Sequence, residues 1–207
     1  MESKRVYRKE RRARSEDETR RRIVEAAMRL HEEVGPRATT ISAIAARASV
    51  QRLTVYRHFA DETAIFRACT SHWLSVNPPP DPASWGAVAA PLERLEAALS
   101  AFYSYYRATE AMWAAAHRDL AEVPALQEPM AAFARFLAAV ADGLFEPFGI
   151  GMPAGAPLRA TIRHALDFPT WAGLDRQRLP EEEKVALVLA WAAGAAATQS
   201  RPSPRAA

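Results

Sequence analysis

The sequence has little of what marks several common classes of protein. Cysteine occurs once in 207 residues, at Cys69, which excludes an intrachain disulfide and a zinc site made of cysteines and points to a reducing compartment. Residues 185–198 contain no charged side chain, but these 14 residues are fewer than the roughly 20 that cross a bilayer. No sustained alternation of polar and apolar residues indicates a β-strand. We therefore expect a cytoplasmic, all-α protein that does not span a membrane.

The charge of the chain is unevenly distributed. Residues 1–67 contain 16 Lys or Arg and 10 Asp or Glu, a net charge of +6, whereas residues 68–207 contain 11 and 14, a net charge of −3. Residues 1–15 are basic and polar, with too few apolar side chains to bury, so we expect a disordered arm. We expect such an arm to lie along DNA phosphates or to reach an adjacent minor groove, and a solvated tail is the alternative interpretation. Binding to a lipid surface is disfavoured because no hydrophobic stripe accompanies the charges.

Residues 16–67 predict three helices, of which the last two form a helix-turn-helix. The first helix, residues 16–34, repeats apolar residues at spacings of three and four and ends at a Gly-Pro pair. The second begins after Thr40, whose hydroxyl can cap a helix start. In the third, donor-rich side chains are interspersed with Val55 and Phe59, which we expect to be buried. A helix with such an outer face fits the major groove of DNA while the preceding helix crosses the backbone.

This segment resembles the helix-turn-helix of the TetR family of transcriptional regulators, whose pattern is T-x-x-x-I-A-x-x-A-G-V-S-x-x-T-L-Y-x-[HY]-F-x-x-K-x-x-L. The matching residues are Thr40, Ile44, Ala45, Ala48, Val50, Thr54, Val55, Tyr56, His58, Phe59 and Ile65. Ser49 departs from the pattern, because it replaces the turn glycine where a left-handed backbone is favoured. Gln51 replaces the usual cap of the third helix. Glu62 replaces a lysine that is commonly near phosphate, so we expect a weaker phosphate contact there.

The resemblance and the polar outer face together predict the residues that contact DNA. They are Thr40, Ser42, Gln51, Arg52, Thr54, Tyr56, Arg57 and His58. Arg52 can donate two hydrogen bonds to a guanine, and Thr54 can contact a thymine methyl group. Tyr56 and His58 suit phosphate, as do the two predicted contacts at the start of the preceding helix. An alternative interpretation of His58 is that it packs beneath Phe59.

The rest of the chain predicts helices. We expect them over residues 61–76, 85–107, 110–122, 124–145, 157–174 and 181–198. Prolines end the first of these helices, and Pro169 kinks or splits the fifth. A Gly/Pro-rich loop is expected over 146–157. The predicted domains are a basic disordered arm over 1–15, a helix-turn-helix DNA-binding domain over 16–67, a helical regulatory and dimerisation domain over 68–200, and a disordered tail over 201–207.

The resemblance also implies how the C-terminal domain works. In this family the last two helices of each subunit pack as a four-helix interface, which implies a homodimer on a palindromic operator in double-stranded DNA. It further implies a cavity for a small-molecule effector that releases the operator. The candidate ligand-binding residues are Phe102, Tyr105, Tyr106, Trp113, His117, Phe133 and Phe168. Core packing is the alternative interpretation for each of them. We expect a sequence-specific, ligand-released repressor that needs no cofactor.

Two other functions are compatible with parts of the sequence. An enzyme could use the C-terminal helical cavity around His117, but His117 and Asp119 do not share a helix face and Glu122 is five residues from His117. The sequence has no phosphate-binding loop, nucleophile elbow or metal-ligand spacing, so we expect no catalytic residue and no metal site. The other alternative is a basic protein that binds nucleic acid nonspecifically, and it predicts that salt weakens binding to all DNA alike.

Overall fold

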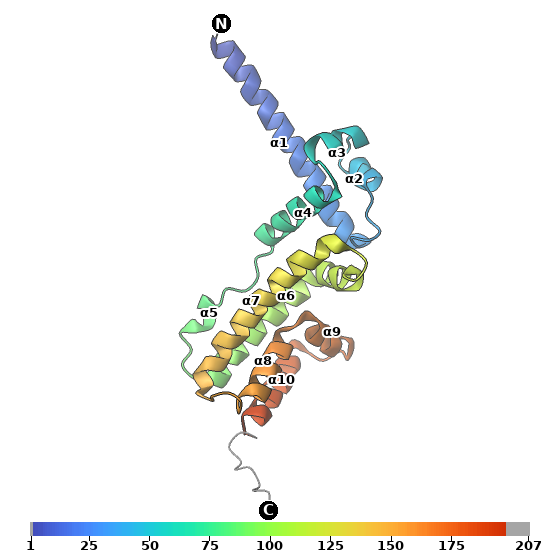
Figure 1. Ribbon diagram of the computed structural model, residues 1–207. Coiled ribbons are helices and arrows are strands. Elements are labelled where there is room, and N and C mark those ends of the chain that lie inside the picture. Colours follow the sequence, from blue (N-terminus) through green and yellow to red (C-terminus); the bar gives the residue numbers. More distant parts are fainter. Residues whose placement is uncertain (1, 198–207) are drawn as a thin grey trace, which may run out of the picture. The chain divides into compact units, whose positions relative to one another are not determined.

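The computed structural model of the protein describes residues 2–197, which contain helices, turns and loops but no β-strand (Figure 1). The helices are α1 (Glu2–Glu33), α2 (Ile41–Arg47), α3 (Arg52–His58), α4 (Glu62–Val76), α5 (Ala83–Gly86), α6 (Pro91–Asp119), α7 (Pro124–Phe145), the 3-10 helix η1 (Glu146–Phe148), α8 (Ala156–Leu166), α9 (Phe168–Arg176) and α10 (Glu181–Ala197). The predicted all-α fold is confirmed for these residues. The tail predicted over 201–207 lies outside the described residues.

The described residues form two compact units. Residues 2–78 and 111–129 form the first unit, and residues 79–110 and 130–197 form the second. The sequence predicts a domain boundary near residue 67. In the structure α4 instead belongs wholly to the first unit, because its buried face packs on α1.

α6 contributes to both units and contains one non-helical residue. Thr109 has a φ of −122° and a ψ of 16°, and its hydroxyl donates to the Tyr105 carbonyl oxygen at 2.6 Å. A threonine hydroxyl that donates to the preceding turn in this way often bends a helix. The sequence predicts separate helices over 85–107 and 110–122, and the break in α6 lies between them.

α1 extends to Glu2, which contradicts the disorder predicted for this arm. Oppositely charged side chains three or four residues apart form ion pairs along the helix. They join Arg12 to Glu16 at 3.1 Å, and Arg21 to Glu18 at 2.8 Å and to Glu25 at 2.9 Å. Such exposed pairs between successive turns favour the helical backbone. Of the residues in these pairs, Arg12 belongs to the predicted arm, and the others belong to the helix predicted over 16–34.

The first unit has one apolar core, to which α1, α2, α3 and α4 all contribute. Its buried members are Ile23, Val24, Ala26, Ala27, Leu30, Ile41, Ile44, Ala45, Ala48, Val55, Phe59, Ile65 and Cys69. This core fixes the short helices α2 and α3 on the long helix α1. The helix-turn-helix is therefore held by burial of apolar side chains rather than by its own helical hydrogen bonds.

Cys69 lies against His31 in this core. Its Sγ is 3.4 Å from Nδ1 of His31, and both side chains are buried. Burial lowers the pKa of His31 to about 4 and raises the pKa of Cys69 to about 12, because charged forms are disfavoured away from water. Both groups are consequently neutral near pH 7. Since the thiolate is the reactive form of cysteine, Cys69 acts here as a packing residue.

The second unit has an aromatic core. Tyr103, Tyr106 and Trp171 are fully buried in it. The Tyr106 hydroxyl donates to the Leu166 carbonyl oxygen at 2.7 Å, and the Tyr103 hydroxyl donates to the Ala165 carbonyl oxygen at 3.1 Å. These bonds satisfy carbonyl groups at the C-terminal end of α8, which have no partner within the helix.

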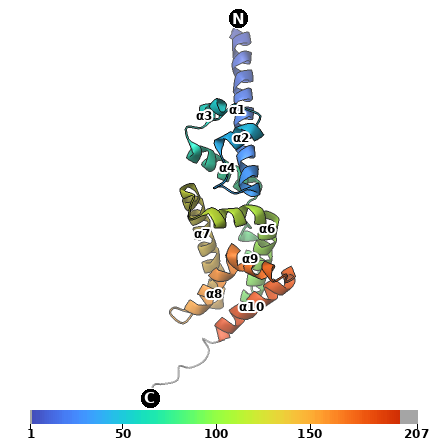
Figure 2. The ribbon, with the colours of Figure 1, turned by 90° about the vertical axis from the view of Figure 1, so that its right-hand side faces the viewer.

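α8, α9 and α10 pack together at the end of the second unit (Figure 2). The sequence predicts one helix over 157–174, whereas the structure divides it at Asp167 and places Pro169 in the first turn of α9. Lys184 of α10 is buried and donates to a carboxylate oxygen of Asp175 on α9 at 2.5 Å. Within residues 2–197 no helix combines the length and apolar character that a membrane span requires.

The loop between α1 and α2 is held by the C-terminal end of α6, within the first unit. The buried carboxylate of Asp119 accepts hydrogen bonds from the backbone N–H of Arg37 at 3.0 Å and from Nε of Arg118 at 2.8 Å. Arg118 also donates to the Val34 carbonyl oxygen at 3.2 Å. The bond from Arg118 is the main reason that the pKa of Asp119 lies below its ordinary value, so this carboxylate stays ionised at neutral pH.

Gly35 permits this close approach. Its φ is +91°, and a Cβ atom at this position would lie 1.9 Å from Nη2 of Arg118 and 2.5 Å from Oδ2 of Asp119. Glycine is required both by the left-handed backbone and by the lack of space.

We expect Gly35→Ala to destabilise the protein by about 1–3 kcal/mol, because the backbone becomes strained and Arg118 must move. Urea or thermal unfolding measures this change. Gly86→Ala is the matched control, since an added Cβ there meets no atom within 4 Å and its φ is not positive. Equal stability of the two variants would show that the contact at Gly35 contributes nothing.

Candidate nucleic-acid interface

α2 and α3 form a helix-turn-helix with the predicted cap and turn. The Thr40 hydroxyl accepts the backbone N–H of Ala43 at 3.1 Å and so caps α2. Ser49 has a φ of 55°, the left-handed backbone expected where the family pattern has glycine. The backbone N–H of Val50 donates to the Ala45 carbonyl oxygen at 2.9 Å and closes the turn.

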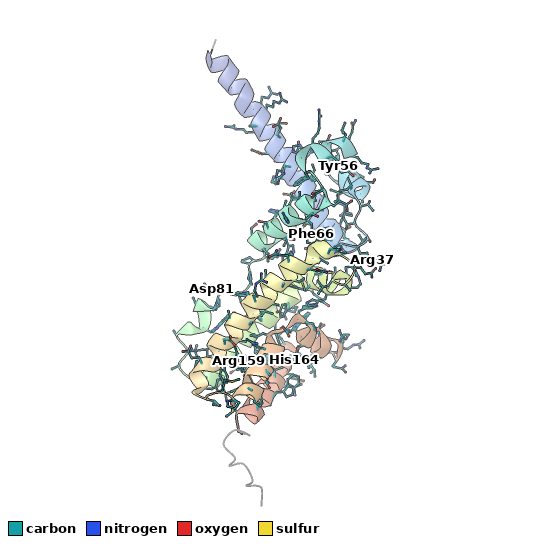
Figure 3. The ribbon with its side chains drawn as sticks, viewed as in Figure 1. Arg37, Tyr56, Phe66, Asp81, Arg159 and His164 are labelled. Atoms are coloured by element: carbon teal, nitrogen blue, oxygen red, sulfur yellow. The ribbon has the colours of Figure 1, made fainter. Side chains whose placement is uncertain are left out.

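The outer face of α3 is polar and exposed. Gln51 precedes the helix without a side-chain capping bond, so its amide is not used at the helix start. Gln51, Arg52, Tyr56 and Arg57 are all exposed, whereas Val55 is fully buried. Figure 3 shows Tyr56 among the side chains of this helix. The four exposed side chains offer hydrogen-bond donors for phosphates and base edges.

Two of the residues on α3 that were predicted to contact DNA are only partly exposed. Thr54 and His58 are half-buried, which limits the area that either can present to a ligand. At the start of α2, by contrast, Thr40 and Ser42 are exposed. The structure thus places six of the eight predicted contacts on the accessible surface of the helix-turn-helix.

Leu53 is an exposed residue of α3 that the sequence did not single out. It is 66% exposed, the highest value among the exposed large hydrophobic side chains described. Its apolar character led to no prediction for it. The signal available was the spacing of two residues between Leu53 and Val55, which places their side chains on nearly opposite sides of a helix.

Arg20 anchors the end of α3 on α1, and sequence reasoning missed it too. Its Nη1 donates to the His58 carbonyl oxygen at 2.8 Å, and its guanidinium carbon lies 4.2 Å from the centre of the Phe59 ring. A cation at a helix C-terminus and over an aromatic face is favourable on both counts. Arg20 therefore helps to set the orientation of the whole recognition surface.

A cavity of about 170 Å³ lies beside the turn of the helix-turn-helix. It is lined by Arg22, Glu25, Ala26, Arg29, Arg47, Ala48 and Ser49. Arg47 is held by two hydrogen bonds to Glu33, at 2.5 and 2.6 Å. Arg22 and Arg29 form no ion pair with any residue whose side chain the structure describes. These arginines add positive charge beside the turn that precedes α3, and such a surface suits a polyanionic partner.

The predicted ligand-binding residues are divided between the two units. Phe102, Tyr105, Tyr106, Phe133 and Phe168 belong to the second unit, and Trp113 and His117 belong to the first. In the second unit Phe102, Tyr106 and Phe168 are buried, while Tyr105 and Phe133 are half-buried. Ring centres of Tyr106 and Phe168 are 5.5 Å apart, and those of Phe102 and Tyr106 are 6.1 Å apart. These spacings are those of packed aromatic side chains.

The acidic residues near His117 have structural partners. Asp119 accepts hydrogen bonds from Arg37 and Arg118, and Glu122 accepts one from Arg37 at 2.8 Å. Burial lowers the pKa of His117, and its ring lies 6.3 Å from that of Trp113. Both carboxylates hold the loop between α1 and α2. Among the described residues, no three His, Cys, Asp or Glu side chains are grouped so that they could bind a metal ion.

Comparison with known proteins identifies the helix-turn-helix. Residues 23–69 match the family described as bacterial regulatory proteins, tetR family. No match to the chain was found among curated proteins. These 47 residues include α2, α3 and the core residues of α1 that support them.

Solved structures share the fold over nearly the whole chain. A TetR-like transcriptional regulator from Rhodococcus sp. RHA1 is 18% identical, with 86% of this chain and 96% of that chain covered and a TM-score of 0.58. A putative fatty acid metabolism regulator from Clostridium perfringens is 16% identical, with coverages of 84% and 97% and a TM-score of 0.61. The multidrug binding protein EbrR, complexed with imidazole, is 18% identical, with coverages of 90% and 92% and a TM-score of 0.50.

Regulators of the family matched by residues 23–69 are transcription factors and not enzymes. Their DNA-binding element corresponds to α2 and α3 here, with the cap, the turn and the exposed outer face described above. Residues 23–69 therefore match the DNA-binding segment of the tetR family of bacterial regulatory proteins, and the described chain shares its fold with solved TetR-like regulators.

Proposed function

We propose that the protein is a sequence-specific repressor that binds a palindromic operator as a homodimer and leaves it when a small molecule binds. The observation that supports this most directly is the exposed, donor-rich face of α3, held rigidly by the core of the first unit. Such a dimer on a promoter excludes polymerase by occupancy. It acts in the cytoplasm, where the operator DNA is.

The proposed DNA contacts differ in role. Arg52 donates two hydrogen bonds to a guanine, and the Gln51 amide and Arg57 are available to neighbouring bases or phosphates. Tyr56 donates its hydroxyl to phosphate. Thr40, Ser42 and His58 add phosphate contacts, and Thr54 has only a small exposed area for a base. Phosphate contacts position the protein, while base contacts specify the sequence.

An exposed apolar face on α10 supports the proposed homodimer. Leu187 and Trp191 are 38% and 39% exposed, and Ala190 and Gly194 are exposed beside them. Spacings of three, four and seven residues place these four positions on one face of the helix. A second copy of the same face can cover it, and the small residues allow close approach of two helices.

The sequence predicted an interface from its last two helices, residues 157–174 and 181–198, which in the structure correspond to α8 with α9 and to α10. α9 has only nine residues, whereas α8 packs extensively along α10. We therefore propose that α8 and α10 of each subunit form the four-helix interface.

The aromatic side chains of the second unit support an effector site. Tyr105 and Phe133 are half-buried at the edge of the aromatic core, where a small apolar molecule can reach them. The structural relative EbrR is described as a multidrug binding protein. An effector releases DNA only if it binds the DNA-incompetent arrangement more tightly than the competent one.

Selection of bound fragments from genomic DNA at near-physiological salt tests the operator. We expect enrichment of one inverted repeat. Arg52→Ala should lose about 1–3 kcal/mol of discrimination at one base pair of each half-site, because a bidentate contact to a base is lost. Tyr56→Phe should weaken all sequences alike by about 0.5–1.5 kcal/mol, because one hydrogen bond to phosphate is lost. Equal, salt-sensitive capture of all fragments would instead indicate nonspecific binding.

Leu187→Glu tests the dimer. Sedimentation should show twice the 22.8 kDa mass for the unaltered chain and an increased monomer fraction for the variant, because a charge would be buried in the interface. Leu74→Glu is the matched control, since Leu74 is 37% exposed and lies on α4. A monomeric unaltered chain at micromolar concentration would contradict the proposal.

Titration of small aromatic and apolar compounds against labelled operator tests the effector. We expect at least one compound to weaken operator binding by about 5- to 150-fold, the usual range of coupling between two sites. Phe133→Ala should reduce the response to that compound while leaving operator affinity in its absence unchanged. Compounds that bind the protein without changing operator affinity would contradict release by a ligand.

A further inference from the structure

We infer that Leu53 selects a thymine in each operator half-site through contact with the 5-methyl group of the base. This inference rests on the proposed binding of α3 in the major groove and adds a residue that determines specificity. Its basis is the position of one apolar side chain at the centre of an otherwise polar recognition surface.

Leu53 points away from the core of the first unit. At about 100° per residue, Leu53 and Arg57 both lie roughly 160° around α3 from Val55, on opposite sides of the direction that faces away from the core. Val55 is fully buried, while Leu53 is 66% exposed. Leu53 and Arg57 therefore occupy the middle of the outer face, with Tyr56 beside them.

Leu53 has no structural task that explains its side chain. The contribution of this segment to the core comes from Val55 and Phe59, which are 0% and 2% exposed. A single exposed leucine elsewhere on a protein is unremarkable in itself. At this position, however, an apolar side chain stands on the surface that meets the base edges. The bases that it contacts therefore affect the sequence specificity of the protein.

The major groove offers one apolar feature that fits such a side chain. Thymine presents a methyl group at C5, whereas purines present N7 with O6 or an amino group, and cytosine presents an amino group. Leucine has no donor or acceptor, so contact with those polar groups would displace their water without replacing its hydrogen bonds. Contact with the thymine methyl group removes apolar surface from water on both sides.

The structure also moves this role from Thr54 to Leu53. Thr54 was expected to contact a thymine methyl group, but it is half-buried on the flank of α3. Leu53 is the neighbouring apolar side chain with free surface. A methyl contact from α3 therefore comes from Leu53.

Replacement of single thymines by deoxyuridine in the selected operator tests the inference, because it removes the methyl group and keeps the base pair. We expect one position in each half-site where the change weakens binding of the unaltered protein about fourfold, the effect of one buried methyl group. Leu53→Ala should bind both operators equally at that position. Since Leu53 is exposed, the thermal unfolding of this variant should match that of the unaltered protein.

Arg57→Ala is the matched control, because Arg57 lies on the same face at the same angle from Val55. It should bind DNA more weakly but retain the fourfold response to deoxyuridine. A response that survives in Leu53→Ala, or an operator with no position sensitive to deoxyuridine, would overturn the assignment to Leu53 and leave the proposed repressor function intact. Failure to select any inverted repeat would overturn the proposed function and this inference together.

Discussion

The recognition surface depends on the burial of two side chains, Val55 and Phe59. α3 has seven residues, and a helix of that length is not stable by itself in water. Its orientation is therefore set by these two side chains in the shared core and by the bonds from Arg20 at its C-terminal end. These contacts of α3 therefore fix the position of every exposed side chain on its outer face. Loss of either anchor would move all the proposed base contacts at once.

The first unit is larger than the helix-turn-helix. Residues 111–129 belong to it, and they provide Asp119, whose buried carboxylate binds the loop that enters α2. Trp73 on α4 likewise donates through Nε1 to Glu32 on α1 at 3.1 Å. Polar contacts between segments far apart in the sequence thus supplement the apolar core. The end of α6 is for this reason part of the DNA-binding structure as well as part of a helix that enters the second unit.

Local features of the sequence predicted much of this structure. The all-α fold, the Thr40 cap and the left-handed backbone at Ser49 depend on side chains close to each other in the chain, which a sequence pattern records. The helical arm was missed because the prediction used only its net charge and low apolar content. The structural role of Asp119 was not predicted, because one of its hydrogen bonds comes from the distant residue Arg37 and no local pattern shows that contact. Leu53 was overlooked because an apolar side chain was not considered as a DNA contact, although the expected burial of Val55 places Leu53 on the opposite side of the helix.

Stability and specificity are assigned to different residues of one short helix. The positions that hold α3 in place, Val55 and Phe59, face inward, whereas Gln51, Arg52, Leu53, Tyr56 and Arg57 face solvent. Surface substitutions usually change folding stability by no more than about 0.5 kcal/mol. The outer residues can therefore diverge between duplicated copies of such a protein without loss of the fold. Single substitutions on the outer face of α3 can therefore change the preferred operator sequence while the protein remains folded.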